Sequence, residues 1–409
     1  MARTDVAVIG GGAAGFFGAI AAAEANPGLR IVILEAGREP LAKVRISGGG
    51  RCNVTHACFD PAELIKAYPR GAKALRGAFS RFQPGDAVDW FARHGVELKI
   101  EDDGRMFPTT DDSTTIVDCL QLAAERQGIQ VWTGTPVRGV TATPEGFRLA
   151  LGNGSDLDAQ HLLLASGSSP GGYRLAEQLG HELVPPVPSL FTFRVADPAL
   201  RELAGVSLPE VRLQLHSGGQ KFQQIGPLLI THWGLSGPAV LKLSAWAARE
   251  LQGDRYQAQL SINWLPTWDG ERLAQSLRAS REQQPRRQLS SWRPVPLPQR
   301  LWLYLLERQG IDPQRRWTET ANRDLERLRE GLHQDRYAIS GKGEFKEEFV
   351  TAGGIRLQDV DFKRMESRLQ PGLHFAGEVL DIDGITGGFN FQNAWTTGWL
   401  AGQAIAAAT

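Results

Sequence analysis

The first 35 residues constrain the fold of this chain more than any other stretch. The apolar, β-branched segment 5–9 predicts a strand, and the alanine-rich segment 13–25 predicts a helix. A second short apolar segment, 31–34, predicts another strand and ends on an acid, Glu35. Strand, tight glycine turn, helix, strand and acid in this order are typical of a Rossmann unit. The sequence therefore predicts an α/β fold that starts with such a unit.

The turn between this strand and helix carries three glycines in G-x-G-x-x-G spacing. Gly10 permits the sharp turn, Gly12 lets the backbone approach a pyrophosphate, and Gly15 lets the helix pack closely on the strand. The helix N-terminus favours phosphate, and Glu35 can accept hydrogen bonds from both hydroxyls of an adenosine ribose. A purely structural turn can carry the same glycines, but the strand, helix and acid around them favour a dinucleotide site. An unphosphorylated ribose fits Glu35 best, which favours FAD or NAD over NADP.

Composition narrows the class of protein. Lys+Arg and Asp+Glu are both 45, so no global charge indicates nucleic acid or an anionic membrane as a partner. Three cysteines in 409 residues give no even disulfide framework and suit a reducing compartment. No apolar run reaches membrane-spanning length, and the N-terminus leads straight into the first strand without a signal peptide. We therefore expect a soluble, cytoplasmic protein of two or three domains.

A long loop is expected over residues 36–60. It carries Lys43, Arg51 and three successive glycines at 48–50. These glycines favour contact between backbone N–H groups and a ligand, because open α/β sheets bind ligands at the carboxyl ends of their strands. The alternative is a flexible surface loop. Cys52 has no C-x-x-C partner, so a packing role is favoured over a redox role.

The following segments predict further parts of an α/β domain. Helices are expected at 84–94 and 116–127, a strand at 129–132, and a small antiparallel meander over 136–160. A strand is expected at 161–165, followed by a glycine turn that begins with Ser166-Gly167. This turn should lie at the same edge of the sheet, where ligands bind. This turn does not repeat G-x-G-x-x-G, so the sequence predicts one dinucleotide-binding domain.

Prolines at 185, 186 and 188 mark a change in composition. From 189 to about 340 the chain is richer in Trp, Gln and Arg, with alternating strands and then polar helices, while residues 341–409 return to the earlier character. We therefore expect a nucleotide domain in two parts, 1–188 and 341–409, around an insert at 189–340. Acids interleave the arginines of the predicted helices, which favours a salt-bridged, solvated surface over a nucleic-acid face.

Three separated motifs in the chain resemble the HI0933-like (BaiN-like) family of flavoproteins. They are SGGGRCNVT at 47–55, THWGLSGP at 231–238, and AGEVLD with GGFNFQ within 376–392. Together with GRMFP at 104–108 and the first glycine turn, they extend the resemblance over almost the whole chain. The resemblance implies a glutathione-reductase-like FAD-binding Rossmann domain, interrupted by a mixed β-barrel-like plus helical insert. His56 stands where Asn is expected.

The resemblance also implies a set of FAD contacts. The ADP half would be held by Gly10, Gly12, Ala13, Ala14, Gly15, Glu35 and Ala36, with the backbone of Val137 against adenine. The flavin and pyrophosphate side would be lined by Lys43, Ser47, Gly48, Arg51, Cys52 and Asn53, with the turn Ala165, Ser166 and Gly167. A C-terminal glycine loop would bring a helix N-terminus to the flavin, where N–H groups stabilise the negative charge of the reduced ring; its residues are Gly377, Glu378, Asp381, Gly387, Gly388, Phe389 and Asn390.

An FAD-dependent oxidoreductase whose insert selects a small-molecule substrate is the leading hypothesis. His232 is the candidate acid or base, and Thr231 and Ser236 are candidates to bind a polar substrate group; a structural histidine is the alternative.

By resemblance, the reaction would be reduction of an enone-like double bond with NAD(P)H as a transient donor. A fumarate-reductase-like or other FAD dehydrogenase is the enzymatic alternative. A flavin-binding redox sensor or an RNA-associated protein is the alternative of another class. No metal site is predicted, and the oligomeric state stays open.

Overall fold

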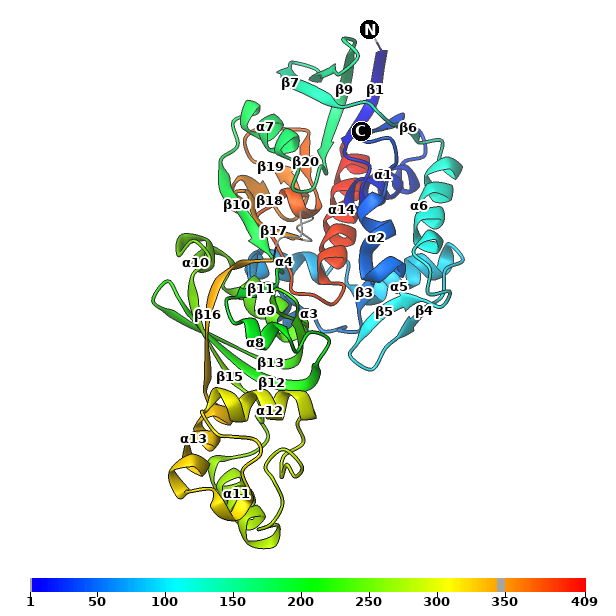
Figure 1. The fold of residues 1–409 in the computed structure, drawn as a ribbon. Coiled ribbons are helices and arrows are strands. Elements are labelled where there is room, and N and C mark those ends of the chain that lie inside the picture. The colour runs from blue at the N-terminus through cyan, green and yellow to red at the C-terminus, as the bar shows by residue number, and fades with distance from the viewer. Residues whose placement is uncertain (1, 344–349) are drawn as a thin grey trace. The chain divides into compact units, whose positions relative to one another are not determined.

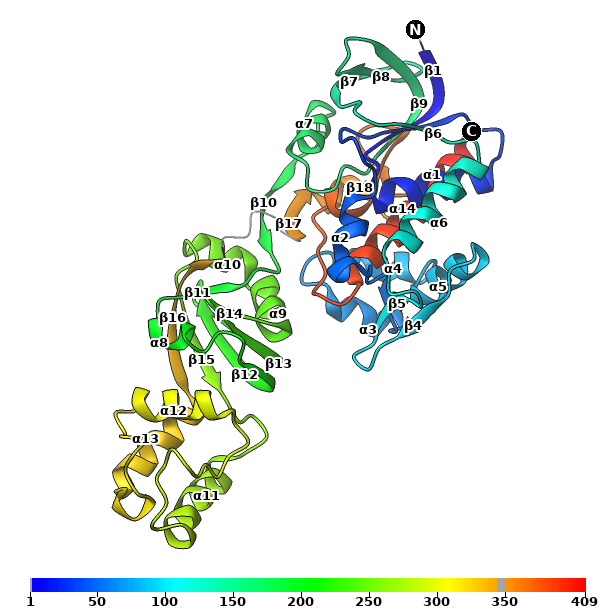
Figure 2. The same ribbon diagram turned by 45° about the vertical axis from the view of Figure 1, so that its right-hand side comes forward.

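The computed structural model describes residues 2–343 and 350–409. These form two compact units, one made of Met1–Val187 with Val350–Thr409 and the other of Pro188–Phe349. The elements of each unit are drawn in Figure 1 and, after a turn, in Figure 2. The last strand of the second unit, β16 (Asp335–Lys342), extends two residues beyond the end that we expected for the insert.

A parallel sheet forms the centre of the first unit. β1 (Ala2–Ile9) lies between β2 (Ile31–Leu34) and β9 (Asp156–Leu164), and β6 (Gln130–Trp132) and β20 (Leu373–Phe375) continue the sheet on either side. All four residues of β2 are buried. A continuous apolar strand of this kind is typical of a parallel sheet covered on both faces. This is the predicted Rossmann architecture.

Two long helices pack directly against each other in this unit. α1 (Ala13–Ala25) begins and ends where the sequence predicts, and α14 (Phe389–Ala408) lies beside it in both views (Figures 1 and 2). A Cβ on Gly398 would come within 2.8 Å of the carbonyl oxygen of Ala14, so the close approach depends on a missing side chain. The C-terminal helix thus lies beside the first glycine turn.

The predicted loop at 36–60 is partly wrong. Residues 42–50 form the helix α2 (Ala42–Gly50), which is interrupted where Ser47, Gly48 and Gly49 leave helical geometry. The three-stranded antiparallel sheet β3 (Thr55–His56), β5 (Arg105–Pro108) and β4 (Leu98–Ile100) follows along the chain. A prediction from glycine content alone missed the one turn of helix before the glycines.

The predicted meander is present, and so are the helices at 84–94 and 116–127 and the strand at 129–132, whose ends differ by one or two residues, whereas other elements of the first unit were not predicted. The meander consists of β7 (Val137–Thr143) and β8 (Gly146–Leu151) with β9, while the proline segment is the strand β10 (Leu183–Ser189), which pairs with β17 (Val350–Ile355). The other helices and strands are α3 (Pro61–Leu64), α4 (Ala72–Phe79), α5 (Pro84–Arg93), α6 (Thr114–Arg126), α7 (Pro170–Gln178), β18 (Val360–Asp361) and β19 (Glu366–Ser367).

The second unit combines a closed barrel with a helical part, as the resemblance implied. The barrel order is β11 (Phe193–Val195), β14 (Gly234–Ser236), β13 (Gln220–Thr231), β12 (Ser207–Ser217), β15 (Ala258–Asn263) and β16. The helices are α8 (Pro198–Arg201), α9 (Pro238–Trp246), α10 (Ala248–Gly253), α11 (Gly270–Gln283), α12 (Gln299–Arg308) and α13 (Asn322–His333). Trp264, Trp302 and Trp317 are buried in one core that spans the barrel and the helices.

Candidate cofactor site

The first glycine turn lies where the carboxyl ends of β1 and β9 meet. A Cβ on Gly10 would lie 2.5 Å from the carbonyl oxygen of Ala165, and a Cβ on Gly15 would overlap the carbonyl of Gly10. Gly12 differs, because a Cβ there would meet no atom within 4 Å among the described residues. Packing therefore requires Gly10 and Gly15, whereas Gly12 borders open space at the N-terminus of α1. Ala13 follows it and is half-buried, and Ala14 is buried in the core.

Glu35 is fixed beside this turn by two backbone groups. Its Oε2 accepts a hydrogen bond from Gly11 N at 2.7 Å, and its Oε1 accepts one from Gly37 N at 2.6 Å. Ala36 lies in the chain between Glu35 and Gly37. Thr135 N donates to the carbonyl oxygen of Glu35 at 2.8 Å, which brings the start of β7 at Val137 close by. The residues predicted for ribose and adenine are thus neighbours in the fold.

A second acid, Glu378, connects three segments at the same edge. Its Oε2 accepts from Lys43 Nζ at 2.7 Å, and its Oε1 accepts from Thr351 N at 2.9 Å. A Cβ on Gly167 would lie 3.7 Å from Glu378 Oε2. The preceding Gly377 donates its N–H to Thr397 Oγ1 of α14 at 2.9 Å. The predicted residues of α2 and those after β9 and β20 are therefore brought together.

The N-terminus of α14 is held by two asparagines. Asn53 Oδ1 accepts from Gly388 N at 2.9 Å and its Nδ2 donates to Thr55 O at 3.0 Å, in the amide orientation that satisfies these neighbours. Asn390 spans the preceding loop, accepting from Gly384 N at 2.8 Å and donating to Gly384 O at 2.9 Å. A helix of 20 residues presents a positive dipole end at this N-terminus.

His56 is a neighbour of this terminus that the sequence did not assign. Its Nδ1 lies 3.0 Å from the carbonyl oxygen of Gly387 and therefore donates to it, and its ring lies 4.5 Å from the ring of Phe389. His56 is one of two places at which the chain departs from the resemblance, the other being the turn at 165–168. Only its place directly after the SGGGRCNVT motif pointed to it.

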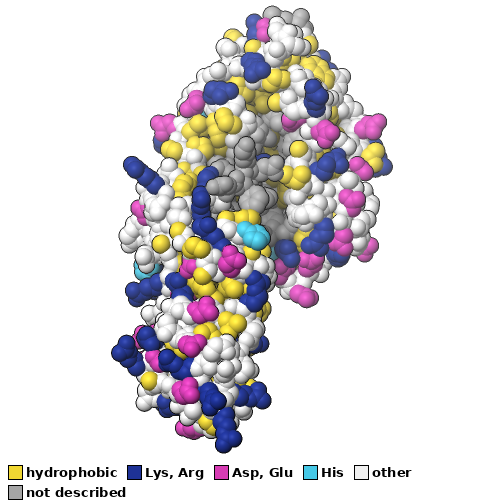
Figure 3. All heavy atoms as spheres, viewed as in Figure 1, with side chains coloured by type: hydrophobic (Ala, Val, Ile, Leu, Met, Phe, Trp, Pro, Cys, Tyr) yellow, Lys and Arg dark blue, Asp and Glu magenta, His cyan; other side chains and the backbone are white. Residues whose placement is uncertain are grey.

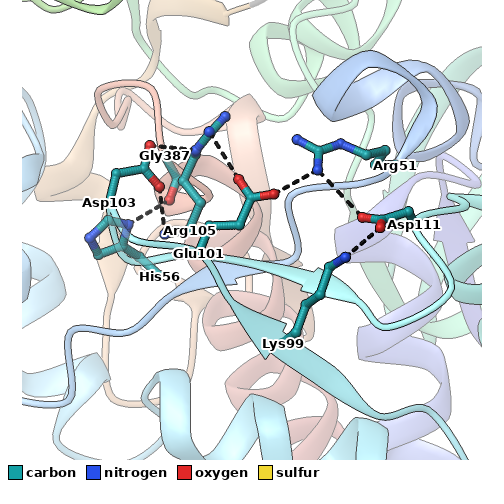
Figure 4. A network of polar contacts seen from close by, with 8 residues as sticks. All are labelled: Arg51, His56, Lys99, Glu101, Asp103, Arg105, Asp111 and Gly387. Carbon is teal, nitrogen blue, oxygen red and sulfur yellow. Dashed lines mark hydrogen bonds and ion pairs between the residues drawn. The ribbon is translucent and has the colours of Figure 1, made fainter. Parts of the chain in front are cut away.

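Figure 4 shows that Arg51 belongs to a network of acids and bases. Its Nη1 lies 2.6 Å from Glu101 Oε1 and 3.4 Å from Asp111 Oδ1, and its guanidinium carbon is 4.0 Å from the centre of the Phe107 ring. The hydrogen bond to Glu101 raises the pKa of Arg51. Lys99 also pairs with Asp111 and is the main cause of the lowered pKa of that carboxyl. The charge of Arg51 is thus balanced within the protein, and the acids that balance it were not predicted.

Other predicted residues of this segment contact the local backbone or are buried. Ser47 Oγ donates to Val44 O at 2.8 Å, and a Cβ on Gly48 would lie 3.0 Å from Asn53 N. The thiol of Cys52 is fully buried, and burial raises its pKa to about 12. A thiol with so little thiolate at neutral pH fits a packing role rather than a redox role.

Sequence reasoning also missed a buried ion pair in the C-terminal loop. Arg70 pairs with Asp383, which has no exposed surface, and the two residues form an isolated antiparallel bridge. Asp381, two residues earlier, is held through its N–H by Ile355 O at 3.1 Å. These contacts fix the chain between β20 and α14, so the glycines before α14 have a defined place.

Two buried hydroxyl groups complete the edge. Ser166 Oγ and the hydroxyl of Tyr173 have no hydrogen-bond partner among the described residues. Burial is the main cause of the raised pKa of Tyr173, and the charges of Glu378 and Asp381 add to it, so the phenol lies near both acids. A buried polar group without a partner is costly, and a bound polar ligand would satisfy these two.

The features of this edge fit FAD. The open space at Gly12 and the N-terminus of α1 suit a pyrophosphate, Glu35 suits a ribose, and the N-terminus of α14 suits the negative charge of a reduced flavin. Among the described residues, no group of three or more His, Cys, Asp or Glu side chains is placed to bind a metal ion. Nor does any described helix combine the length and apolarity needed to cross a bilayer.

The candidates His232, Thr231 and Ser236 lie in the insert. β13 ends at Thr231, His232 and Trp233 form the hairpin tip, and β14 carries Ser236. Thr231 Oγ1 is buried without a partner among the described residues, whereas His232 is exposed. A shallow hollow of about 400 Å³ adjoins the histidine; it is lined by Pro198, Arg201, Glu202, Ala204, His232 and Arg300.

Comparison with known proteins identifies relatives over the full length. Residues 4–404 match the model of the HI0933-like protein Rossmann domain. An Escherichia coli (strain K12) protein named ribosomal RNA dihydrouridine synthase is 34% identical over 420 residues, covering 100% of this chain and 99% of that protein. A Clostridium scindens protein named 3-dehydro-bile acid delta(4,6)-reductase is 29% identical over 409 residues, covering 98% of each.

Solved structures share the fold at low sequence identity. The 3-ketosteroid delta1-dehydrogenase from Sterolibacterium denitrificans aligns with a TM-score of 0.54 at 13% identity, covering 100% of both chains. A flavocytochrome c3 fumarate reductase aligns with a TM-score of 0.52 at 16% identity, covering 99% of this chain and 78% of the other. Together with the full-length family match, the fold and the glycine-rich edge lead to one identification: this chain belongs to the HI0933-like family and is an FAD-dependent oxidoreductase.

Proposed function

We propose that this oxidoreductase saturates a carbon–carbon double bond conjugated to a carbonyl, and that its substrate is a uracil base in ribosomal RNA. The observation that carries the proposal is the 34% identity over the whole chain to a ribosomal RNA dihydrouridine synthase. Dihydrouridine differs from uridine by saturation of the C5–C6 bond, which is conjugated to the C4 carbonyl. The relative named delta(4,6)-reductase of a 3-dehydro bile acid points to the same class of bond.

The site supports this chemistry through the residues that would hold the cofactor. Bound FAD in its reduced form would supply a hydride to the carbon distant from the carbonyl and return to its oxidised form, and a proton would complete the neighbouring carbon. The N-terminus of α14 would stabilise negative charge on the reduced ring, and Asn53 and Asn390 keep that terminus in position. Glu35 and the open backbone at Gly12 would bind the ADP half. NAD(P)H is the proposed electron donor and binds transiently.

A ribosomal RNA substrate departs from the expectation that nucleic acid is not a partner. That expectation rested on a formal net charge of zero over the chain. A total charge says nothing about where the charges lie, and binding of a polyanion depends on local positive surface.

Product analysis on purified holoenzyme tests the proposal. The protein is reduced without oxygen by NADPH or NADH, then incubated with ribosomal RNA from a strain that lacks dihydrouridine in that RNA. Nucleosides are measured by mass spectrometry, and dihydrouridine is expected only with reduced enzyme. Flavin that is reduced, with no dihydrouridine formed, would reject the RNA substrate.

A 3-oxo steroid with 4,6 double bonds serves as the second substrate in the same assay. The 29% identical relative favours this candidate. Loss of the steroid double bonds with no change in RNA would assign a small-molecule reductase instead. If neither pyridine nucleotide bleaches the flavin, the proposed donor is wrong, and chemical reduction with dithionite still allows both substrates to be compared.

A further inference from the structure

The neutral total charge of the chain conceals a separation between its two units. Residues 188–349 contain 23 Lys and Arg and 18 Asp and Glu, a net charge of +5. The rest of the chain contains 22 Lys and Arg and 27 Asp and Glu, a net charge of −5. Figure 3 shows many basic side chains, with acids among them, on the helical part of the insert. The insert is therefore the unit to search for a surface that binds an anion.

Many arginines of the insert helices are neutralised by acids. Arg315 Nη1 lies 2.7 Å from Asp324, whose other oxygen pairs with Arg327. Arg329 Nε donates to Glu326 Oε2 at 2.9 Å. These pairs agree with the predicted salt-bridged surface, and they leave little charge for a partner.

The segment from the end of α11 into α12, residues 283–306, differs from the other helices in this respect. From 283 to 306 the sequence contains no acid, and it contains Arg286, Arg287, Arg293 and Arg300. All four side chains are exposed, and none forms an ion pair with a carboxylate among the residues that the structure describes. Uncompensated guanidinium groups on one segment, three on the loop and Arg300 on α12, are expected to attract phosphate.

Hydrogen bonds connect this segment with the hollow at His232. Arg293 donates to the side chain of Gln299, which in turn donates to the carbonyl of Ser290. Arg300 donates to the backbone carbonyl of Glu202 and lines the hollow beside His232. We call the set Arg286, Arg287, Arg293, Arg300 and His232 the basic strip.

We propose that the basic strip binds the phosphate backbone of the RNA that carries the substrate base. The inference rests on the proposed function, because it names the surface that would hold that substrate. Guanidinium groups match the geometry of phosphate oxygens, and Trp292, whose ring centre lies 5.5 Å from the Arg287 guanidinium carbon, adds an aromatic face. The large exposed apolar side chains of the described residues lie outside 283–306, so the loop lacks the apolar anchors of a membrane-binding surface.

The test uses two triple variants of the full-length, flavin-loaded protein. The strip variant is Arg286→Gln, Arg287→Gln, Arg293→Gln. The control is Arg76→Gln, Arg126→Gln, Arg138→Gln, which removes the same charge from exposed residues of the other unit. Binding of a fluorescent ribosomal RNA transcript is measured by anisotropy between about 50 and 200 mM KCl, and flavin absorbance reports the integrity of each protein.

The strip variant should lose about tenfold or more in affinity at low salt. The slope of log K against log salt should fall by about 2, since each phosphate contact contributes about 0.7 on single-stranded RNA. The control should bind like the wild type. Wild-type affinity and slope in the strip variant would overturn the proposal, and so would binding of phosphatidylglycerol vesicles without binding of the transcript.

The reaction and the surface can fail separately. If the wild type forms no dihydrouridine but the strip variant alone loses salt-dependent RNA binding, the basic strip is supported and the proposed reaction is wrong. If the wild type forms dihydrouridine and the strip variant binds the transcript unchanged, the reaction is supported and the basic strip is wrong.

Discussion

The two units present positive charge in different ways. At the cofactor edge, Lys43 pairs with Glu378, Arg51 with Glu101, and each cation is balanced inside the protein. The positive ends that remain there are the N-termini of α1 and α14, which are made of backbone N–H groups. In the basic strip of the insert, the positive groups are exposed arginine side chains without a carboxylate partner among the described residues.

This difference suits two kinds of anionic ligand. Backbone dipoles are fixed by the fold, need no reorganisation when a ligand binds, and suit a cofactor that stays bound. Exposed guanidinium groups are mobile and strongly screened by salt, which suits a polyanion that must bind and leave. Each prediction below perturbs one side of this comparison, and the effects decrease from the first to the last.

The largest effect is expected from Gly12→Val. The valine would occupy the open space at the N-terminus of α1, where a Cβ meets no atom of the described residues. The fold should persist, while the backbone can no longer approach the pyrophosphate. Purified protein should therefore be free of flavin, which is measured by absorbance after gel filtration.

Gly77→Val is the matched control for this change. Gly77 lies on the exposed side of α4, and a Cβ there also meets no described atom within 4 Å. This variant should keep full flavin and a wild-type circular dichroism spectrum. Full flavin in Gly12→Val would refute the assigned pyrophosphate site, and equal loss in both variants would show a general effect on folding.

A buried ion pair gives the next effect. Asp383→Ala leaves Arg70, which is only 10% exposed, without its carboxylate. Removal of one partner of a buried pair costs about 3–5 kcal/mol, so urea should release flavin at a clearly lower concentration. Glu63→Gln breaks the exposed pair with Lys66 in the same unit and serves as the control. It should change the free energy of unfolding by less than about 1 kcal/mol, so the urea midpoint should move little. Equal shifts would mean that Asp383 does not stabilise the loop before α14.

Glu35→Gln should weaken binding of the cofactor without unfolding the protein. The amide keeps one acceptor but loses the charge that receives the N–H groups of Gly11 and Gly37 and that suits the ribose hydroxyls. Hydrogen bonds to charged groups contribute about 1.5–3 kcal/mol, so the flavin Kd should rise by about 10- to 150-fold. Titration of flavin-free protein with FAD measures this change; an unchanged Kd would show that Glu35 only supports the turn.

The parts that sequence predicted are those determined by local pattern. The strand, glycine turn, helix and acid of residues 1–35 were correct because each is coded by neighbours in the chain. The pairs that complete the edge join distant segments: Arg70 with Asp383, and Asn53 with Gly388. No spacing rule identifies such partners. The helix α2 was missed because its glycines dominate the composition of a segment whose first turn is still helical.

The arginines of the insert show the same limit in another form. Sequence placed acids among the basic residues but could not say which arginines are paired. The packing of α13 near the segment before it brings Arg315 to Asp324, which also pairs with Arg327 one turn along the same helix, so this acid is used within the helical part. The acid-free segment 283–306 was visible in the sequence, and a search for local charge rather than total charge would have found it.

The smallest effect is expected for Glu326→Gln on α13. The carboxylate pairs with Arg329 across one turn, both side chains are partly exposed, and such pairs contribute about 0–1 kcal/mol. Arg329 lowers the pKa of Glu326, so the small stabilisation is present at neutral pH and is lost as the pH falls through the lowered pKa.

The substitution Glu326→Gln also leaves Arg329, which lies outside the basic strip, without this carboxylate. Urea unfolding should therefore shift very little at pH 7, and the salt dependence of transcript binding should stay as in the wild type. A clear gain in RNA affinity would show that the binding surface extends onto α13, and that pairing rather than position separates the two groups of arginines.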